Sequence, residues 1–243
     1  MRLIEIITAK EFKGYFKGYT AYIVSAIYLC LLFAVTFYMA YFFEYNNQNL
    51  FSFFIYQPDV LNILIPALTM KMWAEERKTG TLEFLLTQPV KPQTLVLGKF
   101  LASLLFVLLL ILMTIPFMIY IRAFIVLDIS NILLSSVAVF LCASVLCGLG
   151  CCISACCHSS IIAYLASVFC GWIWENINFD ILLKPVLELL PLLKQRLNGI
   201  LNFRGQYEGL LQGQLNSSTL IYFICLTGLI LWLNTIIVKR SKK

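Results

Sequence analysis

The residues best suited to chemistry lie in the run CCISACCH at residues 151–158, which holds four cysteines and the chain's single histidine. Thiolate and imidazole groups this close together suit a soft metal such as copper or zinc. However, C-C-x-x-x-C-C-H is not a spacing that zinc sites use. On a helix Cys152 and Cys156 share a face, whereas Cys151 and Cys157 point elsewhere. We therefore interpret the cluster as small side chains in close helix packing and expect no metal site.

Other catalytic patterns are also missing from the sequence. The single histidine, His158, falls in a predicted turn, which makes a histidine-based catalytic dyad hard to build. The sequence contains no phosphate loop of the form G-x-x-x-x-G-K-[ST]; its nearest approach, Gly98-Lys99-Phe100, lacks the upstream glycine and the hydroxyl residue. All nine cysteines lie in apolar runs, which excludes a disulfide framework of loop cysteines. We expect the chain not to be an enzyme and to hold no cofactor of its own.

The composition is that of an integral membrane protein. Of 243 residues, 61% are hydrophobic and 12% are charged, whereas soluble domains carry about 25% charged residues. A water-soluble chain of this size could not bury so much apolar surface in one core. We expect the formal charge of +6 to mark a surface that faces anionic lipid, not a nucleic-acid site.

The apolar runs predict an all-α protein with six transmembrane helices. A helix needs about 20 apolar residues to cross a bilayer. The predicted spans are approximately 19–43, 51–73, 100–121, 129–157, 159–177 and 219–238. Six spans place both termini on the same side of the membrane.

The distribution of lysine and arginine predicts which side this is. Thirteen of these residues fall on the side of the termini, namely Arg2, Lys10, Lys13, Lys17, Lys71, Arg77, Lys78, Lys91, Lys99, Lys239, Arg240, Lys242 and Lys243. Five fall on the opposite side, namely Arg122, Lys184, Lys194, Arg196 and Arg204. Cytoplasmic loops carry the excess of positive charge, so both termini are predicted to be cytoplasmic.

Two further segments are predicted to lie at the membrane without crossing it. Residues 1–18 form an amphipathic interfacial helix, with Phe12, Tyr15 and Phe16 on one stripe. This helix serves either as a positional anchor that moves with the first span or as a topology signal, and it divides the chain into 1–18 and a transmembrane domain of 19–243. The outer connection, roughly 178–217, is expected to form short re-entrant helices that cap the bundle before the last span.

The stretch AEERKTGTLEFLLTQPV, residues 74–90, is one of the few charged stretches and lies on the predicted cytoplasmic side. Thr79-Gly80 is expected to break the helix of the second span. A short amphipathic helix then begins near Thr81, carries an apolar stripe that includes Leu82 and Leu85, and ends at the prolines. Such a helix could dock in a cleft on a cytoplasmic partner. The alternative is a solvated loop with an interfacial helix.

This stretch resembles a signature of ABC type-2 exporter permeases. The pattern E-E-R-x-x-G-T-L-E-x-L-L-x-x-P-V, followed by Gly98-Lys99, carries the resemblance, and permeases of the gliding-motility and copper-enzyme-maturation kinds are nearest in layout. The resemblance implies a coupling helix that contacts an ATPase. The residues it implies for this coupling are Glu75, Glu76, Arg77, Gly80, Thr81, Leu82, Glu83, Leu85, Leu86 and Pro89.

The same resemblance implies a permease subunit of an ATP-driven exporter in the bacterial cytoplasmic (inner) membrane. Its partners would be a cytoplasmic ABC ATPase subunit, which binds ATP-Mg, and a second permease subunit, either an identical chain or a paralogue. The spans hold almost no charge, since Asp59 and Glu175 are expected at the interface, so an ion-coupled carrier is disfavoured. The alternative function is a membrane scaffold or assembly subunit that docks a cytoplasmic partner without transport of its own. An intramembrane enzyme ranks below both.

Overall fold

The computed structural model describes residues 2–39, 51–87, 90–122, 129–176 and 202–240. These residues are largely helical and include no strand. The helices are α1 (Arg2–Lys17), α2 (Thr20–Ala34), the π-helical turn η1 (Val35–Met39), α3 (Phe51–Ile55), α4 (Gln57–Thr69), α5 (Lys71–Lys78), α6 (Thr81–Thr87), α7 (Pro92–Met113), α8 (Ile115–Arg122), α9 (Ile129–Cys156), α10 (Ser160–Asn176), α14 (Phe203–Leu211) and α15 (Ser217–Arg240).

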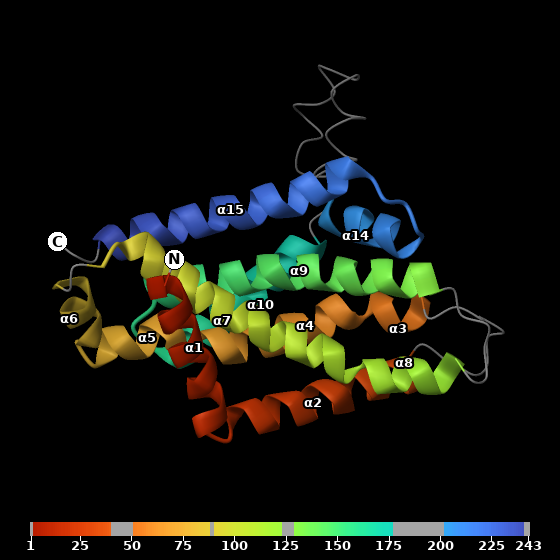
Figure 1. Ribbon diagram of the computed structural model, residues 1–243, viewed down its shortest axis with the longest axis horizontal. Helices are drawn as coiled ribbons and strands as arrows, with labels where there is room; N and C mark the ends of the chain where they lie inside the picture. Colours follow the sequence, from red (N-terminus) through yellow and green to blue (C-terminus); the bar gives the residue numbers. More distant parts are fainter. Residues whose placement is uncertain (1, 40–50, 88–89, 123–128, 177–201, 241–243) are drawn as a thin grey trace, which may run out of the picture.

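Helix α9 lies at the centre of a bundle of long helices (Figure 1) and packs against α4, α7, α10 and α15. Many of its buried side chains are small: Ala138, Cys142, Ala143 and Cys147 are all fully buried. Small residues let helix backbones approach closely, which is how helices associate where lipid tails remove the hydrophobic driving force. The cysteines and alanines of α9 therefore make it the packing axis of the bundle.

Five helical segments are long and apolar enough to cross a membrane, namely Thr20–Phe37, Phe53–Lys78, Pro92–Ile121, Ile129–Cys156 and Ser217–Arg240. They correspond to five of the six predicted spans. The remaining predicted span, 159–177, corresponds to α10, which has 17 residues and packs beside α9 and α4. The all-helical membrane fold is thus confirmed, with five rather than six candidate spans by length.

Two helices extend beyond the predicted membrane spans. The second helical segment continues past residue 73 to Lys78, and the third begins at Pro92 rather than at residue 100. The charge of Lys99 suggested a boundary, but Lys99 lies inside α7 with its charge compensated by neighbours. A paired charge can stay inside a helix that an unpaired charge would end.

Little of the outer connection can be compared with its prediction. Helix α14 is a short helix in that connection, and the Asn202 side chain caps it by accepting a hydrogen bond from the Gly205 N–H. It packs against α9 and α10. The segment LLKPVLELLPLL lies outside the described residues, as do residues 40–50 at the end of the predicted first span.

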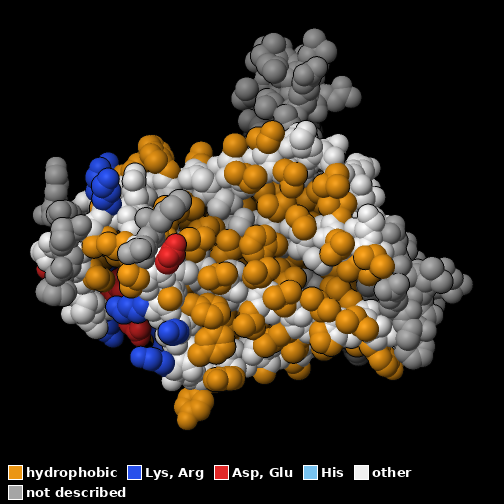
Figure 2. All heavy atoms as spheres, viewed as in Figure 1, with side chains coloured by type: hydrophobic (Ala, Val, Ile, Leu, Met, Phe, Trp, Pro, Cys, Tyr) orange, Lys and Arg blue, Asp and Glu red, His pale blue; other side chains and the backbone are white. Residues whose placement is uncertain are grey.

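Both termini lie at the same end of the bundle as α6, and α14 and α8 lie at the opposite end (Figure 1). Figure 2 shows that charged side chains gather near the end with α6, whereas apolar side chains cover most of the rest of this face. Helix α1 crosses the long helices at a steep angle near that end (Figure 1). This is the orientation of a helix that lies along a membrane surface while the others run through it.

Helix α1 lies directly on α7 because Gly98 has no side chain. The Thr8 hydroxyl donates a hydrogen bond to the Gly98 carbonyl at 3.2 Å. A Cβ at position 98 would lie 2.6 Å from Cγ2 and 2.9 Å from Cβ of Ile7. Ile7 is β-branched and cannot swing away easily, so any side chain at position 98 must push α1 off α7.

We predict that Gly98→Ala destabilises the protein by about 1–3 kcal/mol, the usual cost of overpacking a tight contact. Thermal unfolding of the purified chain, followed by intrinsic tryptophan fluorescence, measures the effect. The matched control is Gly228→Ala on α15, where an added Cβ meets no atom within 4 Å and where alanine should favour the helix. Equal melting temperatures for the two variants would contradict the close approach of α1.

Candidate functional site

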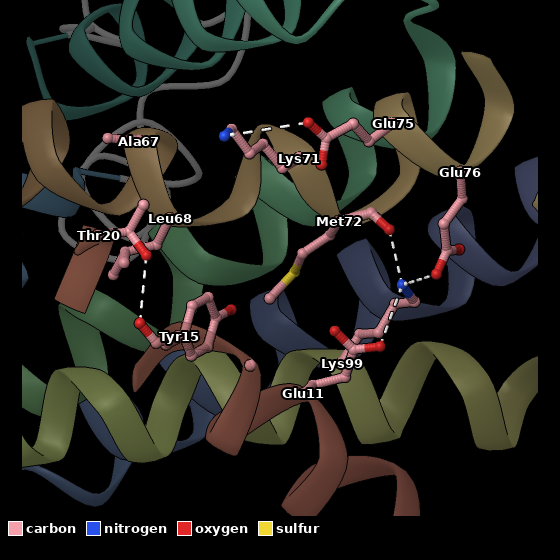
Figure 3. A pocket seen from close by; sticks show the side chains of 11 residues that line it. Glu11, Tyr15, Thr20, Ala67, Leu68, Lys71, Met72, Glu75, Glu76 and Lys99 are labelled. Atoms are coloured by element: carbon pink, nitrogen blue, oxygen red, sulfur yellow. Dashed lines mark hydrogen bonds and ion pairs between the residues drawn. The ribbon is translucent and has the colours of Figure 1, made fainter. Parts of the chain in front are cut away.

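A buried lysine joins three helices at the end of the bundle that carries α6 (Figure 3). Lys99 on α7 is 2% exposed. Its Nζ donates to the Met72 carbonyl and to Glu76 Oε1, both at 2.6 Å, and forms an ion pair with Glu11 Oε1 at 3.5 Å. The ammonium also lies 4.7 Å from the centre of the Trp73 ring. Lys99 therefore links α7 to α5 and to α1.

Two hydrogen bonds and one ion pair compensate the charge of the Lys99 ammonium group. A lysine ammonium has three N–H donors, and three oxygen atoms surround this one. An unpaired charge in such a place would be very costly, while a partly desolvated cation over a tryptophan gains further attraction. The group is therefore stable only while α1, α5 and α7 keep their relative positions.

A sharp turn sets the direction of α6 relative to α5. Gly80 has a φ of +73°, a backbone conformation that residues other than glycine rarely adopt. The Thr79 hydroxyl donates to the Glu75 carbonyl at 2.9 Å and lies 2.9 Å from the Thr81 hydroxyl. The predicted break at Thr79-Gly80 is confirmed. Thr81 is the first residue of α6, and its hydroxyl donates back to the Glu76 carbonyl at 3.3 Å, so it ties the start of α6 to α5.

Helix α6 has an inner side that is packed and an outer side that is exposed. Leu82 is 3% exposed. It belongs to an apolar cluster, here called the end cluster, which consists of Met72, Trp73, Leu82, Leu95, Val96, Cys151, Ala155 and Val238. Glu83 and Thr87 are exposed, and Leu85 is partly buried. Leu82 thus packs α6 against α5 within a cluster that also holds residues of α7, α9 and α15, and Glu83 lies on the exposed side.

The other predicted coupling residues occupy different environments. Glu75 is exposed and lies 3.9 Å from Lys71 as an ion pair on one helix face. Glu76 points inward to Lys99, and Arg77 is partly buried. Nothing is described of the Leu86 side chain or of Pro89. Glu76 and Leu82 therefore position α6 from inside, while Glu83 and Glu75 are available on the surface.

Sequence analysis did not include Lys99, Glu11 or Trp73 among the site residues. A usable signal was present, since Lys99 is a charge in an otherwise apolar run. Charges placed inside membrane helices are generally paired. The identity of the partner could not be read, because Glu11 lies far from Lys99 in the sequence.

The cysteine cluster takes part in packing at the same end of the bundle. The Cys151 thiol donates to the Met72 sulfur at 3.3 Å within the end cluster. Burial raises the pKa of the Cys157 thiol, which disfavours the thiolate that a metal requires. In the described part of the chain, no group of three or more histidine, cysteine or acidic residues could hold a metal ion.

At the opposite end, Glu175 is buried within the protein near the end of α10. The side chain is 5% exposed and lines a small pocket with Asp59, Arg204 and Tyr207. Arg204 bonds Glu208 and Asn176, each at 3.3 Å. Within the described residues, neither oxygen of Glu175 has a hydrogen-bond partner. Helices α4, α10 and α14 meet at this polar point.

We predict that Lys99→Met destabilises the protein by about 3–5 kcal/mol, because it leaves the Glu76 carboxylate buried without its partner. Adding Glu76→Met should restore most of the loss. The control is Lys71→Met, since the exposed Lys71–Glu75 pair is worth less than about 1 kcal/mol. A double-mutant cycle of thermal unfolding measures these values, and additive losses from the two substitutions would refute the coupling between Lys99 and Glu76.

Comparison with known proteins places these features in a family. A family model described as ABC-2 family transporter protein matches residues 6–203, which run from α1 to the first residue of α14 and include α6 and Lys99. A search of curated proteins finds no match. Members of the family are membrane components of transporters, are generally not catalytic themselves, and in general work with an ABC ATPase. The family model covers most of the sequence, and the chain therefore belongs to the ABC-2 family of transporter proteins.

Proposed function

We propose that the chain is the permease subunit of an ATP-driven exporter and that a separate cytoplasmic ATPase subunit docks on α6. The observation that carries this proposal is the two-sided character of α6. Its inner side is fixed by Leu82 in the end cluster, and Glu83 on its outer side is exposed. A helix held in this way can receive a force from a partner and pass it to the bundle without bending.

The contacts of α5 and α7 supply the path for that force. A displacement of α6 acts on α5 through the short turn at Gly80, and it reaches α7 and α9 through the end cluster that contains Leu82. Lys99 then ties α5 and α7 to α1. Because packed interfaces switch between discrete arrangements rather than stretch, the force would tilt the two spans together between inward-open and outward-open states.

The proposed topology has six spans, with α10 as the fifth, and places α6 and both termini in the cytoplasm. The excess of lysine and arginine on that side supports this orientation. Helix α10 runs next to α9 and α4 inside the bundle. A helix of 17 residues reaches about 26 Å at 1.5 Å per residue, close to the thickness of a hydrocarbon layer. We place the protein in a bacterial inner membrane.

We also propose a second permease subunit, identical or paralogous. Among the candidate spans, those of α2 and α15 are the least buried, at 28% each. This leaves long apolar surfaces that can pair with another subunit. The translocation pathway would form between the two permeases, since the centre of this bundle is filled by α9.

We predict that Glu83→Arg abolishes stimulation of the ATPase by the permease while insertion and folding stay normal. The charge reversal removes an exposed acidic contact and buries nothing. ATPase activity in reconstituted vesicles is the measurement. Glu5→Arg, an equally exposed reversal on α1, serves as the control and should leave stimulation intact. Unchanged stimulation in the Glu83 variant would count against docking at α6.

A photo-crosslinking residue gives a second test of the same surface. Placed at position 83, it should capture an ABC ATPase subunit when the complex is irradiated in membranes. Placed at position 82, it should crosslink only within the chain, because Leu82 is buried in the end cluster. If the crosslinking residue at position 83 captures a cytoplasmic protein that does not hydrolyse ATP, the result would favour the scaffold function instead.

A further inference from the structure

The candidate span Phe53–Lys78 is interrupted between α4, which ends at Thr69, and α5, which begins at Lys71. The two segments follow one another along the bundle toward the end that carries α6 (Figure 1), and α9 packs against both. In a continuous helix each N–H donates to the carbonyl four residues earlier, so Trp73 and Ala74 would find their partners within the span. In the structure both N–H groups donate to a side chain of α9.

The hydroxyl of Ser154 on α9 fills this break. Ser154 is fully buried, and its Oγ accepts hydrogen bonds from the Trp73 N–H at 3.2 Å and from the Ala74 N–H at 3.3 Å. Its O–H donates to the Met70 carbonyl at 2.9 Å. A serine hydroxyl has one donor and two acceptor sites, so this single break uses its whole capacity. A side chain that inserts into the hydrogen-bond ladder of a helix is a common cause of a bend.

The glycine at position 150 lets α9 come close enough for this insertion. Gly150 lies one turn before Ser154, and a Cβ added there would meet Oγ1 of Thr69 and lie 3.1 Å from its Cβ. The next residue, Cys151, contacts the Met72 sulfur at 3.3 Å. Successive contacts from one side of α9 therefore hold the end of α4 and the start of α5 in their present relation.

The hydrogen bonds at the break have a second possible arrangement. If α9 withdraws, the Trp73 and Ala74 N–H groups can bond within their own helix, which joins α4 and α5 into one straight helix. The Ser154 hydroxyl can then donate to a carbonyl of α9, as the hydroxyls of Ser136 and Ser167 do with the carbonyl four residues earlier in their own helices. Both arrangements pair these groups, so neither carries the cost of an unpaired backbone group in a membrane. Two arrangements of similar free energy can exchange.

We propose that the junction of α4 and α5 is a hinge whose position is set by Ser154, and that the span alternates between a bent state with Ser154 inserted and a straight state without it. Lys99 joins α5 to α1 and α7, so these elements follow when α5 turns. The consequence for coupling rests on the proposed function, because a force on α6 would select between the two states. The bend itself is a property of the isolated chain.

The test measures distances by double electron–electron resonance in the full chain, purified in detergent without any ATPase. One spin label stands at position 78, at the exposed end of α5, and the other at position 161 on α10 or position 239 on α15, which are also exposed. A non-natural amino acid carries each label, which leaves the nine native cysteines unlabelled. Position 78 lies about 12 Å along the helix from the break, so a change in bend of about 20° moves it by about 4 Å.

Ser154→Ala should shift at least one of the two distances by about 4 Å. Alanine leaves the Trp73 and Ala74 N–H groups without a partner in the bent state, and only the straight state pairs them. The matched control is Ser167→Ala on α10, a buried serine whose hydroxyl donates to the Ala163 carbonyl of its own helix; it should leave both distances unchanged. Wild-type distances in the Ser154 variant would overturn the hinge.

A substitution at Gly150 tests the hinge without altering Ser154 and remains informative where the serine variant does not fold. Gly150→Ala places a methyl group against Thr69 and should push α9 away from α4, which withdraws Ser154 and shifts the distances in the same direction. Adding Thr69→Ala removes the Oγ1 that the methyl group meets and should restore the wild-type distances. Wild-type distances in Gly150→Ala alone would show that α9 does not control the bend.

The complex with the ATPase separates the hinge from the proposed function. In Ser154→Ala, a crosslinking residue at position 83 should still capture the ATPase, whereas stimulation of ATP hydrolysis should fall at least roughly tenfold, because an unpaired N–H group removes most of the bent state. Normal stimulation together with shifted distances would overturn the role of the hinge in coupling. If position 83 captures no ATPase even in the wild-type chain while the distances of the isolated variant shift, docking at α6 is refuted and the hinge stands.

Discussion

The arrangement of the end of the bundle that carries α6 depends on one ammonium group held away from water. Lys99 is tolerated inside α7 only because Glu76, Glu11 and the Met72 carbonyl surround it. Each partner comes from α1 or α5, so the charge can be satisfied only in the assembled bundle. Because removing the ammonium from water is costly, its ion pairs add little net stability. However, the loss of any partner would leave a buried charge unpaired, so the partners must keep their positions. Gly98, the residue before Lys99, has no side chain and therefore lets α1 lie close enough to α7 for Glu11 to reach Lys99.

The same constraint explains how a helix as short as α6 can be stable. Seven residues are too few to form a helix alone in water, and α6 has no long partner of its own. Its start is fixed by hydrogen bonds among Thr79, Thr81 and the α5 carbonyls, and its inner side is fixed by Leu82. The α5 segment that carries it is in turn held by Lys99. The exposed side of α6 is therefore held in place by the contacts that hold its inner side and α5.

Much of this structure could be predicted from local sequence patterns. The rest could not be predicted, because it depends on contacts between residues that are distant in the sequence. The helical spans followed from apolar length, and the break before α6 followed from Thr79-Gly80. The leucine stripe of α6 was visible, but its direction was not, since the same stripe could face a partner or the bundle; Leu82 faces the bundle. The role of Lys99 could not be predicted, because its pairing with Glu11 requires that α1 fold back over α7. Glu175 was expected at the interface because it lies near the outer end of a predicted span, and its burial depends on α4 and α14, which pack against α10 only in the folded bundle.

The apolar contacts divide the bundle in a way that bears on how it could move. The end cluster around Leu82 and Trp73 is separate from the larger core that fills the spans. In the described residues, Tyr15 on α1 and Leu231 on α15 pack against both clusters. Helices α7, α9 and α15 also contribute residues to both clusters, so a motion of the end cluster is passed along these helices into the larger core. A force on α6 would then tilt the helices that run through both clusters, with α1 held to them through Tyr15.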